Sequence, residues 1–315
     1  MTLLGNSDLD VFPLALGGNV FGWTVDAAGS EAVLDAFTAA GGNFVDTSDS
    51  YSAWVPGNQG GESETIIGDW MASRGNRDSI VVGTKVSQHP QFKGLRAANV
   101  AAAADASLAR LKSDHIDLYY GHFDDASVPL EETAGAFNDL VVAGKVRWVG
   151  LSNYSAERIT EWIGIAKANG YALPVAVQPH YNLVHREPYE SEIAPVVKAN
   201  GLAVVPYFAL AAGFLTGKYR TKDDLAKSAR GGASAAYLTE EGLAVIDALQ
   251  HMAEARETRI AEIALAWLLS RPGVVAPIAS ARTPDQLDDL LSSTHLELTG
   301  PEVERLNQLS ARIPA

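Results

Sequence analysis

Four polar side chains of different chemistry lie at or just beyond the ends of apolar runs. Asp46, Lys85 and His122 each close such a run, and Tyr51 follows five residues after Asp46. Together they suit proton transfer to a carbonyl oxygen, because a tyrosine has an ordinary pKa of about 10 and a nearby ammonium group favours its phenolate form. Lys85 can supply that charge, and Asp46 can hold the lysine in place. His122 can donate a hydrogen bond to the substrate oxygen or share the proton relay.

Each of these residues also has an ordinary structural explanation. An aspartate that ends a strand often marks a turn, a lone histidine is often structural, and a tyrosine after a Ser/Asp turn often lies on the surface. A metal-dependent hydrolase built on Asp46 and His122 is a further alternative. The two-histidine spacing of such a site is missing, because His115 and His122 are seven residues apart on one run. The occurrence of all four side chains after sequential runs favours one shared site.

Short runs rich in β-branched and aliphatic residues alternate with segments of helical periodicity. Continuous apolar runs indicate strands that are buried on both faces, as in a parallel sheet. The repeat therefore predicts an α/β fold of the (β/α)8 barrel type, with a doubly wound sheet as the alternative. The predicted strands are Val11–Leu16, Asn43–Thr47, Ile80–Lys85, Ile116–His122, Val146–Asn153, Val175–His180, Leu202–Tyr207 and Val274–Ser280. The predicted helices are Ser30–Ala40, Glu62–Arg74, Ala97–Lys112, Leu130–Ala143, Ala156–Asn169, Pro188–Asn200 and Thr239–Leu269.

Capping residues and glycines mark the ends of these elements. Ser30, Ser63 and Ser155 are predicted to cap the starts of helices. Leu4–Asp8 resembles a hairpin turn ahead of the first barrel strand. No linker divides the chain, so residues 1–315 are predicted to form a single barrel domain. Glycines stand where helices are expected to end in a left-handed residue, at Gly41, Gly75, Gly144, Gly170 and Gly201.

Two long loops depart from the minimal repeat. Ser52–Gly61 follows the second predicted strand, and Ala209–Tyr237 follows the seventh. Both fall at carboxyl ends of strands, the face that carries active sites in a barrel, so we expect them to shape a substrate pocket. Trp23, Trp54 and Phe123 are predicted to wall that pocket, which suits apolar, aromatic or sugar rings. The tryptophans predicted to serve packing instead are Trp70, Trp148, Trp162 and Trp267.

Composition excludes several classes of function. The chain has 24 Lys and Arg against 38 Asp and Glu, a net charge of −14, which disfavours nucleic acid and anionic membranes as partners. It has no cysteine, so disulfides, thiolate metal sites, iron–sulfur clusters and cysteine nucleophiles are excluded. No metal site is expected. The sequence shows neither a secretory leader nor a long apolar stretch, which predicts a cytoplasmic protein.

The residues around the four polar side chains resemble those of a known family. Asn43–Thr47 with Tyr51, Gly83–Lys85, and Asp117–His122 followed by Asp124-Asp125 are similar to the Asp, Tyr, Lys and His tetrad motifs of the aldo-keto reductase superfamily. The resemblance covers nearly the whole chain, and we expect a bacterial member. Other segments resemble the family's fifth strand, its sixth strand and the loop after its seventh, namely Gly144–Arg147 with Gly150–Asn153, Val177–Asn182 and Gly213–Tyr219.

The resemblance implies a nicotinamide cofactor that lies extended across the barrel mouth without a Rossmann fold. It implies that Ser152, Asn153 and Gln178 hold the carboxamide and that Tyr207 stacks on the nicotinamide ring. An ordinary helix cap before Ser155 is the alternative explanation of Ser152-Asn153. The resemblance further implies cofactor contacts from the loop after the seventh strand and from the segment after the eighth. These are Leu210, Gly213 and Lys218, and Ser280, Arg282, Gln286 and Asp289.

The adenosine end departs from the family's pattern in two places. Tyr207–Leu210 lacks the serine of the family's frequent Tyr-Ser-Pro-Leu, and Asp289 stands where many members carry asparagine. Arg282 can bind a 2′-phosphate through charge-assisted hydrogen bonds, or it is a solvated surface arginine. The charge of Asp289 would lie unfavourably near that phosphate. NADP(H) is therefore favoured as the cofactor, with NAD(H) as the alternative.

The function implied is the NAD(P)H-dependent interconversion of a carbonyl, in an aldehyde, ketone or sugar, and its alcohol. Tyr51 is expected to act as the general acid and base. The substrate partner is then a small molecule. The alternative is a cofactor-binding regulatory subunit with slow or vestigial turnover, because channel β-subunits share the family's fold and tetrad.

Overall fold

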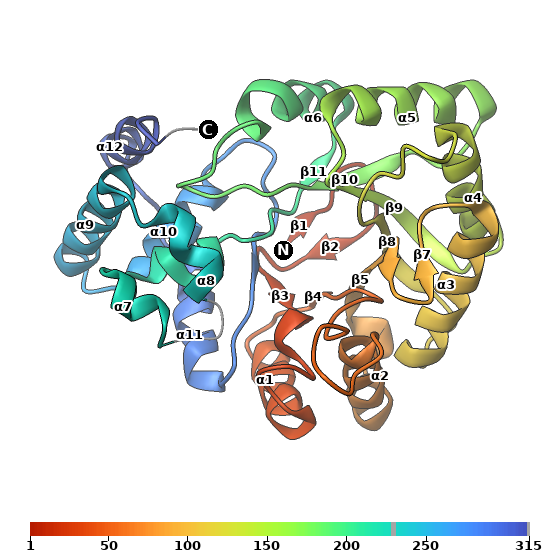
Figure 1. The fold of residues 1–315 in the computed structure, drawn as a ribbon, viewed down its shortest axis with the longest axis horizontal. Helices are drawn as coiled ribbons and strands as arrows, with labels where there is room; N and C mark the ends of the chain where they lie inside the picture. Colours follow the sequence, from red (N-terminus) through yellow and green to blue (C-terminus); the bar gives the residue numbers. More distant parts are fainter. Residues whose placement is uncertain (228–230, 314–315) are drawn as a thin grey trace.

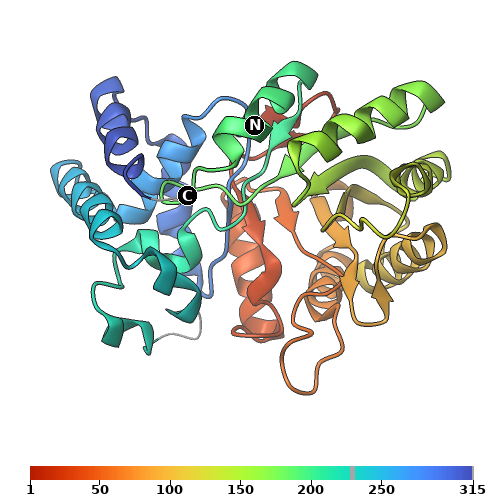
Figure 2. The ribbon, with the colours of Figure 1, turned by 45° about the horizontal axis from the view of Figure 1, so that its top comes forward.

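Eight parallel strands form the inner sheet, and helices surround it (Figures 1 and 2). The structure is a computed structural model that describes residues 1–227 and 231–313. All pairings in this sheet are parallel, with registers such as Leu16↔Val45 and Gly83↔Leu118. In sheet order the strands are β11 (Ala203–Val204), β10 (Pro174–Gln178), β9 (Val146–Ser152), β8 (Ile116–Gly121), β5 (Val81–Val86), β4 (Phe44–Asp46), β3 (Ala15–Gly17) and β12 (Ile278–Ala279).

Backbone hydrogen bonds join the two edges of this sheet. The amide of Val204 donates to the carbonyl of Gly273 at 2.8 Å, and the amide of Val275 donates to the carbonyl of Val204 at 3.0 Å. The amide of Ile278 donates to the carbonyl of Pro206 at 2.9 Å. The segment that leads into β12 therefore lies against the segment of β11. Closure of this kind confirms the predicted (β/α)8 barrel and shows that a doubly wound sheet is wrong.

The helices pack their apolar faces onto the outside of the barrel. Trp70, Trp162 and Trp267 are at most 1% exposed, which confirms their predicted packing role, and Trp148 is only partly buried. The helices are α1 (Ala27–Ala39), α2 (Glu62–Arg74), α3 (Ala97–Leu111), α4 (Leu130–Val142), α5 (Ala156–Asn169), α6 (Ala194–Asn200), α7 (Lys222–Leu225), α8 (Gly231–Ser234), α9 (Glu240–Ala255), α10 (Ile260–Leu269), α11 (Pro284–Ser292) and α12 (Gly300–Ser310).

Helix ends agree with the sequence at some positions and differ at others. Ser155 accepts a hydrogen bond from the Arg158 amide and caps α5, as predicted. The expectations for Ser30 and Ser63 are wrong, because both lie inside the first turn of their helices. Ser30 donates to the carbonyl of Asp26, the residue that caps α1, and Ser63 donates across to the carbonyl of Gly18. All five predicted C′ glycines have positive φ angles, between 62° and 88°.

The predicted helix Thr239–Leu269 is wrong, because it is interrupted after Ala255. Glu257 has a left-handed φ of 54°, and the chain starts a new helix, α10, after Arg259. Glu262 accepts a hydrogen bond from the Arg259 amide, which is the capping box of the new helix. The predicted helix Pro188–Asn200 is also shorter in its regular part, since a π-helical turn (Tyr189–Ile193) precedes α6.

A hairpin closes the amino-terminal end of the barrel, and Figure 1 shows it in the middle of the ring of helices. β1 (Thr2–Leu3) and β2 (Asp10–Val11) pair antiparallel around the predicted turn Leu4–Asp8. Val11 therefore belongs to the hairpin. Its predicted place in the first barrel strand is wrong, because it pairs with Thr2. The apolar side chains of the hairpin pack against the residues that fill this end of the barrel, in a cluster that includes Leu4, Leu9, Val11, Phe44, Leu118 and Tyr120.

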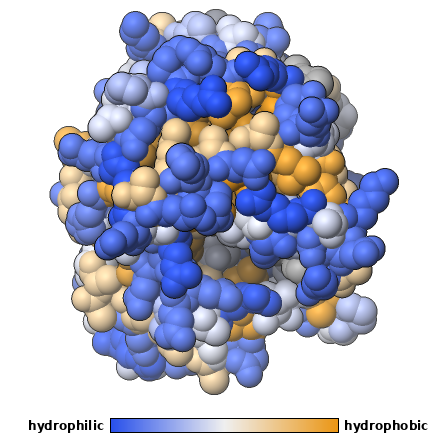
Figure 3. Space-filling view, turned by 90° about the vertical axis from the view of Figure 1, so that its left-hand side faces the viewer, coloured by the Kyte–Doolittle hydropathy of each residue, from blue (hydrophilic) through white to orange (hydrophobic). Residues whose placement is uncertain are grey.

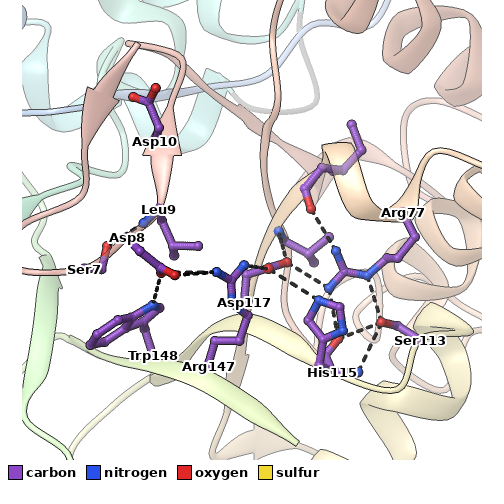
Figure 4. A network of polar contacts seen from close by, with 12 residues as sticks. Ser7, Asp8, Leu9, Asp10, Arg77, Ser113, His115, Asp117, Arg147 and Trp148 are labelled. Carbon is purple, nitrogen blue, oxygen red and sulfur yellow. Dashed lines mark hydrogen bonds and ion pairs between the residues drawn. The ribbon is translucent and has the colours of Figure 1, made fainter. Parts of the chain in front are cut away.

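A polar network ties the hairpin to three barrel strands (Figure 4). Asp117, which is 2% exposed, accepts hydrogen bonds from Arg77 Nη2 at 2.8 Å, Arg147 Nη1 at 2.9 Å and the Val82 amide at 3.0 Å. Arg147 also pairs with Asp8 of the hairpin turn at 3.0 Å. The hydrogen bond from the Trp148 indole, followed by the ion pair with Arg147, lowers the pKa of the Asp8 carboxyl group. The network therefore fixes the closed end opposite the predicted site.

The carboxyl end of the barrel carries the long loops. Ser52–Gly61 joins β4 to α2, and Ala209–Tyr237 contains α7 and α8, although residues 228–230 of the latter lie outside the described residues. A small antiparallel pair, β6 (Gln88–His89) and β7 (Phe92–Lys93), follows β5. On the side that carries α7, α9 and α12, hydrophilic residues cover most of the surface (Figure 3). Within residues 1–227 and 231–313, no helix has the length and apolarity needed to cross a membrane.

The network predicts unequal costs for two similar substitutions. Asp117→Asn should lower the free energy of unfolding by about 3 kcal/mol, because it leaves two arginines without a buried carboxylate. The matched control Asp8→Asn should cost less than about 1 kcal/mol, because the Asp8 side chain is 67% exposed. Urea unfolding followed by circular dichroism measures both. Equal losses for the two variants would show that the network does not hold the closed end.

Candidate active site

A cavity of about 1070 Å³ lies at the carboxyl ends of the barrel strands. The tetrad residues Asp46, Tyr51 and His122 line it. Lys85 and Ser152 are 0% and 1% exposed and are not among the lining residues. The structure thus brings residues from separate strands together, as the sequence predicted for a barrel. The other predicted residues that line the cavity are Trp23, Trp54, Phe123, Asn153, Gln178, Tyr207, Leu210, Gly213, Lys218, Ser280, Arg282, Gln286 and Asp289.

The ammonium group of Lys85 connects the tetrad. Its Nζ donates to Asp46 Oδ2 at 2.6 Å, to the Thr47 carbonyl at 2.6 Å and to the Tyr51 hydroxyl at 3.2 Å. These three bonds account for all three hydrogens of the ammonium group. Gln178 Nε2 donates to the other oxygen of Asp46 at 2.8 Å. The result is a fixed cation beside the Tyr51 oxygen.

Burial and pairing act in opposite directions on the Lys85–Asp46 pair. Burial alone would lower the pKa of Lys85, but the Asp46 carboxylate and the Tyr51 hydroxyl outweigh it and raise that pKa. Burial raises the pKa of Asp46, although the contacts with Lys85 and Gln178 oppose that shift. Lys85 therefore remains protonated at neutral pH and keeps its charge against Tyr51.

His122 stands on the other side of Tyr51. The two ring centroids are 6.2 Å apart in an edge-to-face arrangement, and His122 Nδ1 lies 3.3 Å from the Ser48 hydroxyl. Burial and the charge of Lys85 lower the pKa of His122 well below its usual value. The imidazole is therefore neutral at neutral pH and carries one hydrogen that it can donate from one ring nitrogen.

Aromatic rings form one wall of the cavity. Trp54 packs edge to face on Trp23 with ring centroids 5.5 Å apart, and on Tyr51 at 6.2 Å. Phe123 packs on His122 at 5.0 Å. Trp54 and Phe123 are 51% and 42% exposed, so their faces remain open to a ligand. Exposed aromatic rings beside polar groups are typical of sites that bind small molecules.

The residues predicted to hold the carboxamide already form a hydrogen-bonded set. Ser152 Oγ donates to the Gln178 carbonyl at 2.9 Å, and Asn153 Nδ2 donates to the His122 carbonyl at 2.9 Å. Asn153 has a left-handed φ of 59°, and its Oδ1 accepts from the Tyr207 hydroxyl at 2.7 Å. Asn153 is thus held in place by its neighbours and is not a simple helix cap.

Cationic and capping groups also line the cavity. The backbone amide of Arg282 donates to Gln286 Oε1 at 3.0 Å, so the Gln286 side chain supports its own loop at the start of α11. Asp289 lies 3.7 Å from Arg259 in an ion pair. Lys218 and Arg282 line the same cavity. The start of a helix with a nearby arginine can bind an anion.

Sequence reasoning missed Arg259 and its neighbour Thr258, which both line the cavity. The reason is the interrupted helix, since a continuous helix Thr239–Leu269 would have left no loop there. The residue types gave no signal of the break, because Arg259 stands where a helix cap is usually Ser, Thr, Asp or Asn. Asn19 was also missed; it lines the cavity and accepts a hydrogen bond from Ser280 Oγ at 2.6 Å.

Comparisons with known proteins agree with this geometry. A model of the aldo/keto reductase family matches residues 13–311. The chain is 32% identical to norsolorinic acid reductase B of Aspergillus parasiticus, over 95% of this chain and 81% of that protein. It is 33% identical to a probable voltage-gated potassium channel subunit beta of rice, over 95% and 93%, and 30% identical to the aldo-keto reductase YhdN of Bacillus subtilis, over 94% and 87%.

The family model spans almost all of the barrel, and the relatives cover both its strands and its long loops. The chain therefore belongs to the aldo/keto reductase family and is an oxidoreductase of that family.

Proposed function

We propose that this protein interconverts a carbonyl group and its alcohol with NADP(H), and that Tyr51 is the general acid and base. One observation carries the proposal, which is the Lys85 ammonium group fixed 3.2 Å from the Tyr51 hydroxyl by a buried Asp46. A phenol beside a permanent cation can release a proton and later recover it, because the cation stabilises the phenolate. The substrate is a small aldehyde, ketone or sugar, and the proposed setting is the cytoplasm. Residues 1–315 act as one domain in this proposal.

Each residue of the tetrad has a separate task in the reduction. Tyr51 protonates the carbonyl oxygen, and Lys85 stabilises the charge left on the phenolate. Asp46 holds Lys85 and balances its charge. His122 donates a hydrogen bond to the same carbonyl oxygen, which aligns it with the Tyr51 hydroxyl. When bound, the nicotinamide cofactor supplies the hydride that reduces the carbonyl carbon.

The donor groups of the cavity fit such a cofactor. Next to Asp46 and Tyr51, the cavity presents amide and phenol groups that can bind a carboxamide and face a ring. The cavity also presents cations that can bind phosphate, which supports NADP(H), while Asp289 and its pairing with Arg259 leave NAD(H) as the alternative. The proposed cofactor residues are Ser152, Asn153, Gln178, Tyr207, Leu210, Gly213, Lys218, Ser280, Arg282, Gln286 and Asp289.

The aromatic wall supports a ring-bearing substrate. Trp23, Trp54 and Phe123 offer flat apolar faces at the mouth, and the similarity to norsolorinic acid reductases supports reduction of a carbonyl compound. A second candidate is a regulatory subunit that binds the cofactor and turns over slowly. It is favoured by the similarity to the probable channel subunits beta of rice and Arabidopsis. Multiple turnovers with small aldehydes favour the enzyme, whereas a single oxidation of retained cofactor favours the subunit.

Replacement of Tyr51 by phenylalanine tests the general acid. Tyr51→Phe should lower kcat for aldehyde reduction by about 10²–10⁴-fold, because the variant cannot donate a proton. NADPH binding, measured by fluorescence, should change little. Tyr171→Phe, a hydroxyl deletion at a residue that does not line the cavity, is the matched control and should retain full turnover. Undiminished turnover in Tyr51→Phe would refute the assignment.

Replacement of Lys85 by methionine tests the cation. Lys85→Met should also lower kcat by about 10²-fold or more, since Tyr51 loses its neighbouring charge. The variant also leaves Asp46 buried without its cation, which costs about 3–5 kcal/mol of stability. The double variant Asp46→Asn with Lys85→Met removes both charges and should recover much of that stability while turnover stays low. Recovery of turnover with stability would mean that Lys85 is only structural.

Replacement of Arg282 by alanine tests the adenosine end. Arg282→Ala should raise the Kd for NADPH by about tenfold or more, because a hydrogen bond to a charged group contributes about 1.5–3 kcal/mol. The Kd for NADH should change much less. Arg305→Ala, on the exposed face of α12 and outside the cavity, is the control. Equal losses for NADPH and NADH would remove Arg282 from 2′-phosphate recognition.

A further inference from the structure

Three buried polar side chains lie behind the tetrad, in the short segment between Thr47 and Tyr51. Ser48 and Asp49 are 0% exposed, and Ser50 is 8% exposed. The reaction steps assigned above use none of them. Burial of a carboxyl group is unfavourable unless its surroundings compensate, so the presence of Asp49 beside Ser48 calls for a physical reason.

Ser48 connects His122 to Asp49. Its hydroxyl lies 3.3 Å from His122 Nδ1, 3.3 Å from Asp49 Oδ1 and 3.1 Å from the Ser50 hydroxyl. A serine hydroxyl has one hydrogen, so Ser48 can donate to only one of these atoms at a time. The direction of this bond therefore depends on the protonation state of its neighbours.

Among residues 1–227 and 231–313, the cation near Asp49 is Arg110, which is paired with another carboxylate. Asp49 Oδ2 is buried and has no hydrogen-bond partner among the described residues. Glu64 of α2 faces it, and the nearby Arg110 of α3 is hydrogen-bonded to Glu64 Oε2 at 2.6 Å. The phenol of Tyr119 on β8 is the other titratable group nearby. Burial first, and then the Glu64 charge, hold the pKa of Asp49 well above its usual value against the opposing charge of Arg110.

We propose that Asp49, acting through the Ser48 hydroxyl, sets which ring nitrogen of His122 carries the hydrogen. Asp49 is then a positioning residue, and the inference rests on the proposed function because it gives His122 its donor. Asp49 acts on the neutral imidazole of His122, which lines the cavity together with Tyr51.

The two protonation states of Asp49 have opposite consequences. A protonated carboxyl group donates to Ser48 Oγ, Ser48 donates to His122 Nδ1, and Nε2 then carries the hydrogen that a carbonyl oxygen needs. An ionised carboxylate accepts from Ser48 instead, so His122 holds its hydrogen on Nδ1 and offers only a lone pair at Nε2. Because the donor exists only while Asp49 is protonated, carbonyl reduction should fall as pH rises through the pKa of Asp49.

Nitrogen NMR of the free protein with ¹⁵N-labelled histidine tests the inference without turnover. The two neutral tautomers have distinct nitrogen shifts, and the His122→Asn variant identifies the His122 signals. In the wild type, His122 should change from Nε2–H to Nδ1–H as pH rises through the pKa of Asp49, which lies well above its usual value. Ser48→Ala and Asp49→Asn should both abolish that change. Asp124→Asn, at a carboxylate paired with Arg158, is the matched control and should keep it.

A His122 tautomer that does not respond to pH in the wild type, or that responds equally in Asp49→Asn, overturns the inference. The outcome is separable from that of the proposed function. Loss of turnover in Tyr51→Phe together with an unresponsive tautomer would leave the reductase intact and remove the role of Asp49. A tautomer that Asp49 controls, in a protein without reductase turnover, would support the role of Asp49 and refute the proposed function.

Discussion

The buried ion pair between Lys85 and Asp46 is the constraint on which the rest of the site depends. Both side chains are at most 1% exposed, so each has lost its hydration and must be compensated by fixed partners. The Thr47 carbonyl, the Gln178 amide and the Tyr51 hydroxyl supply those partners. The pair and its partners come from β4, β5, β10 and the loop after β4, which the barrel brings to one point. The geometry of the site therefore depends on the barrel fold.

Two aspartates three residues apart show how surroundings assign roles. Asp46 and Asp49 are both buried, yet Asp46 meets a lysine and a donor amide, whereas Asp49 has an acidic neighbour and an oxygen without a hydrogen-bond partner in the described part of the chain. The first environment suits a carboxylate and the second suits a neutral acid. Pairs of carboxyl groups whose environments separate their pKa values are a recurring arrangement at sites that move protons.

The closed end of the barrel contains a stabilising polar network, and the open end contains the cavity. The closed end holds the hairpin and the Asp117 network, in which two arginines and a backbone amide converge on one carboxylate (Figure 4). The open end holds loops, exposed aromatic rings and the cavity. A net charge of −14 would repel an anionic ligand at long range, but Lys218, Arg259 and Arg282 line the cavity. Local cations of this kind can outweigh a distant field, because salt screens interactions beyond about 10 Å.

The sequence by itself determined the eight strand runs, most of the helices, the C′ glycines and the four polar residues of the tetrad. These are carried by periodicity and by residue type, which are local properties of the chain. Tertiary structure decided the interruption before Arg259 and the place of Val11 in the hairpin. It also decided the contact of Ser48 with His122, which lie 74 residues apart. The contact of Ser48 with His122 depends on which distant atoms meet a buried polar group, and no local pattern encodes that choice.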